Sequence, residues 1–143
     1  MCLTLLNKNK YTAKKNILVY KMLEELNVCK PLKNIKETPY QYVTVKFKRG
    51  RTTQESCLVA ENNQHVRTGI HAFTYKGKSD ETVRYLDHFL NWGLKTYYAV
   101  IPKGSSYYLG TQNDVATNKL ITFLTKEDFE KSSYAKDYET IVE

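Results

Sequence analysis

The stretch from residue 69 to residue 123 most constrains the fold, because it places one clear helix between runs of strand-forming residues. Residues 69–74 form a short and mostly apolar run, which predicts a strand. A helix is predicted from about residue 79 to residue 93, with Ser79 as its N-cap and a glycine as its stop. Residues 95–101 then predict a tyrosine-rich strand that ends at a proline.

The predicted helix has a wide apolar surface. Two neighbouring sides of the helix hold apolar or aromatic residues at helical spacing. One side consists of Val83, Leu86 and Leu90, and the other of Tyr85, Phe89 and Trp92. A surface of this width must pack on a sheet, so the helix is expected to cover one face of the strands.

The remaining strands are predicted from short apolar or alternating runs, at residues 3–6, 17–23, 40–47, 56–60, 106–109 and 119–124. A helix over residues 17–26 is the competing interpretation of the second run. Polar loops or turns are expected at residues 7–16, 28–39, 48–51, 61–68 and 111–118. An acidic helix is predicted over residues 127–138, followed by a frayed end. Together these elements predict a single α+β domain over residues 1–143, with a mainly antiparallel or mixed β-sheet, one main packed helix and a weaker C-terminal helix.

Length and composition narrow the class of protein. The chain has 143 residues, 41% of them hydrophobic and 12 of them tyrosine, which indicates one folded domain rather than a disordered segment. No signal peptide and no membrane-spanning run is recognised, so a cytoplasmic protein is expected, and a host-cell cytoplasm is one such compartment. Three widely spaced cysteines and three scattered histidines predict free thiols, no metal site and no cofactor.

Positive charge is concentrated in the first part of the chain. The formal net charge is +7, and residues 1–52 hold 12 lysines and arginines against 3 glutamates. Residues 53–143 hold 10 basic against 12 acidic residues. This asymmetry indicates an anionic partner, which is a nucleotide, a nucleic acid or an acidic protein surface. A basic face that only aids solubility is the alternative.

The segment from Pro102 to Ser106 offers glycine and serine beside a lysine, which can present backbone N–H groups and a cation to a phosphate. Its spacing is not that of a P-loop, and a tight turn between strands is the alternative. Tyrosine pairs flank the segment on both sides, and within each pair the rings point to opposite faces of the sheet. The predicted ligand contacts in this region are Tyr97, Lys103, Ser105, Ser106 and Tyr107.

His71 lies within the strand at residues 69–74 and is a candidate ligand contact or catalytic base, against the commoner role of a hydrogen-bonded core histidine. Arg67 joins it on the same face if that strand extends backwards. Cys2 is a candidate N-terminal nucleophile once the initiator methionine is removed, and a small apolar residue of the first strand otherwise.

Four short segments, at residues 1–4, 19–21, 69–73 and 101–110, carry a resemblance to known proteins. They resemble a group of small uncharacterised proteins of bacteriophages and gut bacteria. The resemblance implies a phage or mobile-element origin and supplies no activity. By analogy with small phage proteins that counter bacterial defence, it implies capture of a host nucleotide signal.

A weaker resemblance is to ADP-ribosyltransferase-like folds. In these, one strand carries a basic residue, a second carries a threonine or serine and a late strand carries a catalytic glutamate. Lys21 and Thr74 match the first two parts, and Thr74 is therefore a candidate ligand contact. Residues 118–122 contain no glutamate, so the resemblance implies a binding fold without transferase activity.

The leading hypothesis is a non-catalytic binding protein that sequesters a nucleotide or cyclic nucleotide, with a homo-oligomer expected to enclose the site. The second hypothesis is a small hydrolase or nucleotide-processing enzyme that uses His71, with or without Cys2. The third is an inhibitor that docks its basic part on a host protein. No membrane partner is expected, and no DNA-reading motif is recognised.

Overall fold

The computed structural model describes residues 3–24, 47, 49–62, 64–90 and 94–141. Twelve strands and two α-helices are present in these residues. The strands are β1 (Leu3–Thr4), β2 (Tyr11–Thr12), β3 (Asn16–Glu24), β4 (Arg51–Glu55), β5 (Val59–Glu61), β6 (His65–Thr68), β7 (Ile70–Phe73), β8 (Leu94–Ile101), β9 (Ser106–Leu109), β10 (Asp114–Thr117), β11 (Lys119–Phe123) and β12 (Tyr138–Thr140). The helices are α1 (Lys76–Leu90) and α2 (Lys126–Lys131), and a 3₁₀ turn, η2, spans Ser133–Ala135.

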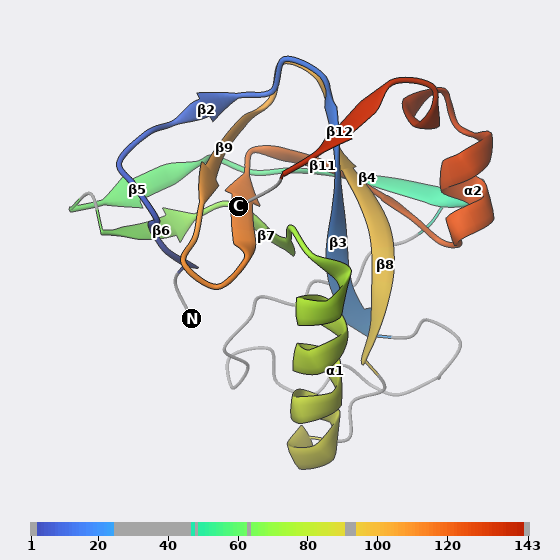
Figure 1. The fold of residues 1–143 in the computed structure, drawn as a ribbon, viewed down its shortest axis with the longest axis horizontal. Helices are drawn as coiled ribbons and strands as arrows, with labels where there is room; N and C mark the ends of the chain where they lie inside the picture. Colours follow the sequence, from blue (N-terminus) through green and yellow to red (C-terminus); the bar gives the residue numbers. More distant parts are fainter. Residues whose placement is uncertain (1–2, 25–46, 48, 63, 91–93, 142–143) are drawn as a thin grey trace.

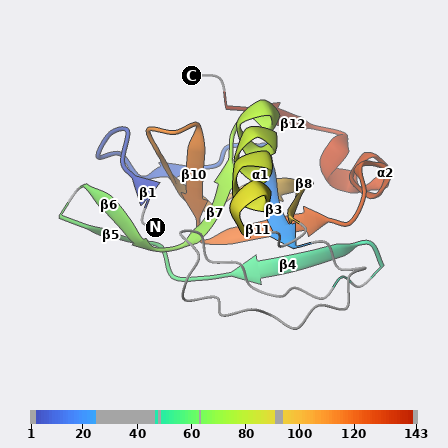
Figure 2. The ribbon, with the colours of Figure 1, turned by 90° about the horizontal axis from the view of Figure 1, so that it is seen from below.

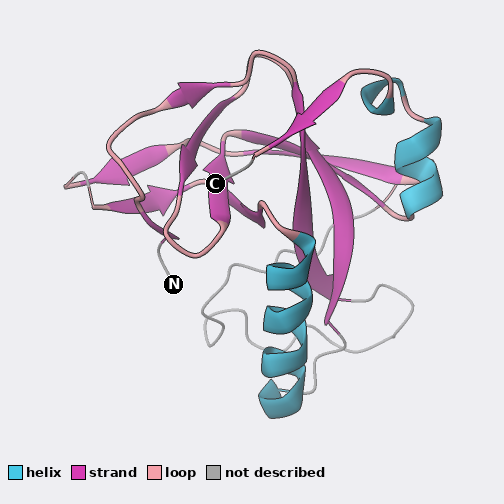
Figure 3. Ribbon diagram, in the orientation of Figure 1, coloured by secondary structure: helices cyan, strands magenta, loops and turns pink. Residues whose placement is uncertain are grey.

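Most strands belong to one curved sheet, which Figures 1 and 3 show from the same side. Its order is β2-β9-β10-β7-β3-β8-β11-β4, and all neighbours in this order are antiparallel. β12 adds a parallel pairing to β3, and β1, β6 and β5 form a smaller antiparallel sheet. The prediction of an α+β fold with a mainly antiparallel sheet and one main helix is confirmed.

β3 is the central strand of the large sheet. It pairs with β8 over eight residues, from Ile17 opposite Ile101 to Glu24 opposite Leu94. Its continuous apolar run is buried on both faces, because Ile17 and Val19 join one core cluster while Leu18 joins another. The strand interpretation of this segment is therefore confirmed, and the competing helix over residues 17–26 is wrong where the structure describes it.

Three core clusters lie on the two faces of the sheet, one on the concave side and two on the outer side. The first fills its concave side and contains Ala13, Ile17, Val19, Ile70, Ala72, Ala99, Ile101, Val115 and Leu120. The second lies under α2 and contains Leu18, Val100, Ile121, Phe123 and Phe129. The third lies under α1 and contains Met22, Phe73, Leu86 and Leu94. Each helix is thus fixed by its own apolar patch on the outer face of the strands.

α1 packs beside β3 and β7, as Figure 2 shows from below. Val83 and Leu86 face the sheet as predicted. Two expectations are wrong. The helix begins at Lys76, so Ser79 is not its N-cap but lies buried inside it, with its hydroxyl 2.8 Å from that of Thr96. Tyr85 is 62% exposed, so the second side of the helix is not packed against the sheet at this position.

Several predicted loops contain strands. Residues 7–16 hold β2, residues 61–68 hold β6 and residues 111–118 hold β10. β10 is the clearest case, because β7 and β9 pair with it on both sides and satisfy its backbone. The strand expected at residues 56–60 begins later than predicted, because β5 starts at Val59 and ends at Glu61.

The C-terminal segment also differs from expectation. α2 ends at Lys131, well short of residue 138, where Ser132 caps it by donating its backbone N–H to the carbonyl of Phe129. The frayed end that the sequence predicts contains β12 instead, which pairs with the first residues of β3. This pairing brings Tyr138 back against the sheet.

The strand predicted at residues 40–47 lies outside the described residues, apart from Phe47, which is not in a strand. The basic turn that follows is confirmed where it is described, since Arg49 and Gly50 both adopt positive φ angles before β4 begins. In the part of the chain that the structure describes, no helix has the length and apolar character needed to span a membrane.

Among the residues that the structure describes, the buried charged side chain on the concave face is that of Lys21, which is 6% exposed. It lies opposite Tyr97 in the β3–β8 pairing, and its Nζ donates a hydrogen bond of 2.6 Å to the carbonyl oxygen of His71. Burial lowers the pKa of Lys21 to about 8, from an ordinary value of 10.5.

This shift predicts a specific pH dependence of stability. Between about pH 8 and pH 10.5 the unfolded chain binds more protons than the folded chain, so the free energy of unfolding rises with pH. The rise from this group is on the order of 3 kcal/mol. We expect Lys21→Met to lack it, as measured by urea unfolding of both proteins at a series of pH values. Equal pH dependence of the two proteins would contradict the assignment.

Candidate functional site

The segment from Pro102 to Ser106 forms a tight turn between β8 and β9, with Gly104 at a φ of +91°. All of its backbone N–H groups already have partners. Lys103 and Ser106 donate to the side-chain oxygens of Asn16 and Asn118, each at 2.9 Å. Gly104 donates to the carbonyl of Ala13, and Ser105 donates to that of Pro102. The turn therefore presents no N–H cradle to a phosphate, and the alternative interpretation as a connecting turn fits the structure.

The flanking tyrosines divide between the two faces of the sheet, as the alternation predicts. Tyr97 is 3% exposed and packs with Leu23 and Phe47, so its selection as a stacking residue is wrong. Tyr107 is half-buried and stacks on Tyr11, with ring centroids 5.4 Å apart. The other member of the first pair, Tyr98, lies on the opposite face and remains accessible.

The remaining predicted contacts do not lie together. Thr74 is buried at the end of β7 next to the β9–β10 turn, where its N–H donates to the carbonyl of Asn113. The pairing of β7, β10 and β9 puts this end opposite to the end where Lys103 lies. Arg67 is exposed on β6, which belongs to the smaller sheet, because a bend at Gly69 separates β6 from β7. Arg67 and His71 therefore do not share one strand face.

His71 lies on β7 opposite Ala116 and is half-buried. Burial, and then the charge of Lys21, lower its pKa to about 4. The imidazole is therefore neutral at pH 7, and it is a weaker base than a catalytic histidine poised near that pH. Cys2, its partner in the enzyme hypothesis, lies outside the described residues, and the exposed Cys57 is a free thiol.

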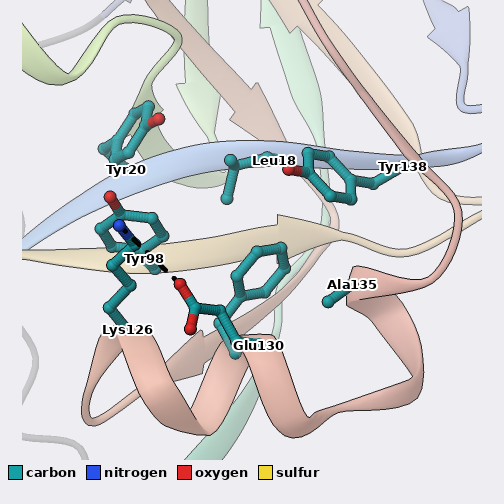
Figure 4. A pocket seen from close by; sticks show the side chains of 8 residues that line it. Leu18, Tyr20, Tyr98, Lys126, Glu130, Ala135 and Tyr138 are labelled. Carbon is teal, nitrogen blue, oxygen red and sulfur yellow. Dashed lines mark ion pairs between the residues drawn. The ribbon is translucent and has the colours of Figure 1, made fainter.

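A pocket of about 460 Å³ lies instead on the outer face of β3 and β8, beneath α2. Figure 4 shows its side chains, with Tyr20 and Tyr98 at one end and Tyr138 and Ala135 at the other. Its lining residues come from β3, β8, α2, η2 and β12, and they are Leu18, Tyr20, Tyr98, Lys126, Phe129, Glu130, Ala135 and Tyr138. We call this site the aromatic pocket.

The rings of the aromatic pocket form a continuous cluster. Tyr20 meets Tyr98 edge-on, with centroids 5.3 Å apart. Phe129 is buried and lies between Tyr98 and Tyr138, with centroid separations of 6.0 and 5.4 Å. Tyr138 is 42% exposed, so it forms an open wall. The result is a surface of electron-rich rings that is open to solvent on one side.

Charged groups border the aromatic pocket on two sides. The Nζ of Lys126 lies 6.0 Å from the centroid of Tyr98 and 3.7 Å from a carboxylate oxygen of Glu130. Lys76 lies in the first turn of α1, and its Nζ is 2.8 Å from a carboxylate oxygen of Asp80. The charge of Lys76 also acts on Tyr20. Burial, and then the neighbouring Tyr98, raise the pKa of Tyr20, so its hydroxyl stays protonated at neutral pH and can donate a hydrogen bond.

Sequence reasoning singled out the tyrosine pair that contains Tyr98 but not the pocket itself. Tyr20 sits in an apolar strand, and Lys126, Glu130 and Tyr138 sit in a segment that is polar and acidic overall. The only local signal is the aromatic residue on the outer face of each central strand. The convergence of these segments depends on tertiary packing.

No family model matches this sequence, no curated protein is significantly similar to it, and no solved structure is significantly similar to the fold. Among the residues that the structure describes, no group of three or more histidine, cysteine or acidic side chains is arranged to hold a metal ion.

The depressed pKa of His71 leads to a prediction that separates a packed histidine from a catalytic base. We expect NMR titration of its imidazole to give a pKa of about 4, with the resonance assigned by its loss in His71→Gln. Because the unfolded chain binds the extra proton, His71 also destabilises the fold as the pH falls from about 6.5 towards 4. A titration near pH 6.5 to 7 would instead support the enzyme hypothesis.

Proposed function

We propose that this protein binds a small anionic aromatic ligand of the nucleotide class in the aromatic pocket, and holds it without converting it. The observation that carries the proposal is the convergence of Tyr20, Tyr98 and Tyr138 with Lys126 in one pocket of about 460 Å³. This volume lies within the range typical of small-molecule sites, roughly 300–1,000 Å³.

The rings suit the planar part of such a ligand. A nucleobase stacks on tyrosine or phenylalanine, and each such contact contributes about 1–3 kcal/mol by alanine substitution. The accessible Tyr138 and the half-buried Tyr98 lie on either side of Phe129, which supplies the floor. The phenol hydroxyls add hydrogen bonds that can distinguish one base edge from another.

The lysines suit the phosphate. Lys126 and Glu130 are both more than half exposed, so their ion pair contributes only about 0–1 kcal/mol and Lys126 can turn to a ligand at low cost. Lys76 also acts on Tyr20, but its ion pair with Asp80 at 2.8 Å offsets its charge, so Lys126 is the lysine of the lining that is offered to the phosphate. The net charge of +7 favours the approach of an anion.

The residues that line the aromatic pocket favour binding of the ligand without its chemical conversion. The tyrosines, one lysine and one exposed glutamate offer no paired nucleophile and base. His71 is not among the lining residues. Together with the resemblance to small phage proteins, this supports a protein that sequesters a nucleotide signal, with a cyclic nucleotide of host defence as the leading ligand.

The proposal is tested by thermal-shift and calorimetric screens against linear and cyclic nucleotides, with chromatography of each ligand afterwards. Specific stabilisation with intact ligand is the expected result, and a tight ligand in excess raises stability by a few kcal/mol, about 2.7 at 100 times its Kd. Ligand that is chemically altered would make the protein an enzyme. Neither shift nor turnover would redirect the search to protein partners.

Removing the open wall of the aromatic pocket should weaken binding. We expect Tyr138→Ala to lower nucleotide affinity by about 5- to 100-fold, because it deletes one stacking surface. Tyr138→Phe should keep most of the affinity. Tyr85→Ala is the matched control, since Tyr85 is even more exposed but lies on α1 and does not line the pocket. Equal losses in Tyr138→Ala and Tyr85→Ala would contradict the site.

The phosphate contact is tested by a charge deletion on α2. Lys126→Ala should weaken a nucleotide about tenfold, the scale of one charge-assisted hydrogen bond, and should leave the corresponding nucleoside unaffected. Lys131→Ala is the control, because Lys131 lies on the same helix outside the pocket lining. Lys103→Ala should have no effect, and a loss there would restore the turn at residues 102–106 as the site.

A further inference from the structure

A second surface of the molecule gathers positive charge without using the aromatic pocket. The bend between β2 and β3 lies against the turn between β8 and β9, as Figure 1 shows at the edge of the sheet. Ala13 exchanges backbone hydrogen bonds with Gly104 and Ser105, and Asn16 accepts one from Lys103. Five exposed lysines therefore follow one edge of the molecule, and we call them the basic edge: Lys8, Lys10, Lys14, Lys15 and Lys103.

In the described part of the chain, the acidic residues near the basic edge are few: Asp137 pairs with Lys15, and burial and then the charge of Glu139 raise the pKa of Tyr107. Residues 3–23 contain no aspartate or glutamate. Within the described residues, Lys15 has one ion pair, with Asp137 at 3.7 Å, and both side chains are more than half exposed. Such a pair contributes about 0–1 kcal/mol. The other four lysines form no ion pair with any described residue, so their charges are available to a partner.

Aromatic rings lie in the middle of the basic edge. Tyr11 of β2 stacks on Tyr107 of β9, with centroids 5.4 Å apart and an angle of 17° between the ring planes. Both residues are half-buried, and the hydroxyl of Tyr11 accepts a hydrogen bond from the side-chain nitrogen of Asn7. The ring of Tyr11 is thereby held in place, and in the chain it lies between Lys10 and the Lys14–Lys15 bend.

We propose that the basic edge binds single-stranded nucleic acid, with its lysines on the phosphates and Tyr11 as a stacking platform for a base. A positive strip combined with aromatic side chains is the general arrangement for binding single strands without sequence preference, and Tyr11 is half-buried rather than fully enclosed. A double helix keeps its bases stacked on one another and cannot use Tyr11. An acidic protein surface could pair with the lysines, but this charge pairing does not require stacking on the ring of Tyr11.

The test uses fluorescence anisotropy of the whole protein with a labelled oligothymidylate on the order of 20 nucleotides long, which exceeds the site size of small single-strand-binding domains. The triple variant Lys10→Ala, Lys14→Ala and Lys103→Ala should bind more than about tenfold more weakly and show a shallower dependence on salt. The matched control removes three exposed basic residues elsewhere, Arg51→Ala, Arg84→Ala and Lys131→Ala, and should bind almost as wild type.

The contribution of the ring is tested at constant charge. Tyr11→Leu should weaken oligothymidylate about fivefold or more, whereas Tyr11→Phe should not. Thermal unfolding of each variant separates loss of binding from loss of fold. Duplex DNA of the same length should bind more weakly than the single strand and should be insensitive to Tyr11→Leu.

Three outcomes would overturn the proposal. The first is no binding at low salt. The second is an equal loss in the two triple variants, which would mean that only net charge matters. The third is that polyglutamate of matched charge displaces the oligothymidylate while Tyr11→Leu leaves the affinity for oligothymidylate unchanged. This result would indicate an acidic protein partner. Tyr138→Ala and Lys126→Ala should leave oligothymidylate binding unchanged, so this inference and the proposed nucleotide pocket can fail independently.

Discussion

The pairing of β3 with β8 is the interaction on which the rest of the structure depends. Eight consecutive residue pairs join the two strands, and both faces of β3 are covered by side chains. One face closes the concave core around Val19, while the other supports both helices. Because Tyr20 and Tyr98 are themselves a pair in this ladder, the same backbone hydrogen bonds that stabilise the sheet also fix the two rings of the aromatic pocket.

The parts of the fold that depend on local pattern could be predicted from the sequence. The apolar run of β3 and the spacing of Val83 and Leu86 on α1 are examples, because burial of these side chains requires a strand period or a helix period. β10 could not be predicted in this way. Its residues, Asp114–Thr117, lie among turn formers, and they form a strand because β7 and β9 supply hydrogen-bond partners on both sides.

The candidate site, like β10, could not be predicted from local sequence pattern alone. A lysine beside glycine and serine suggests anion binding, but the N–H groups of that turn are used by Asn16, Asn118 and backbone carbonyls. Apart from Pro102, which lies in the turn itself, those partners are distant in sequence, so only the tertiary structure reveals them. The aromatic pocket likewise needs α2 and β12 to return to the outer face of β3, and the pairing that brings Tyr138 there is a parallel one between β12 and the first residues of β3.

The most direct test of the central claim is an NMR titration of the protein, labelled at its tyrosine rings, with the nucleotide that stabilises it most. A ligand in the aromatic pocket should shift the ring resonances of Tyr20, Tyr98 and Tyr138 and leave those of Tyr85 and Tyr107 in place. The account would be contradicted if Tyr107 shifted while the three pocket tyrosines did not, because the ligand would then lie near the turn at residues 102–106.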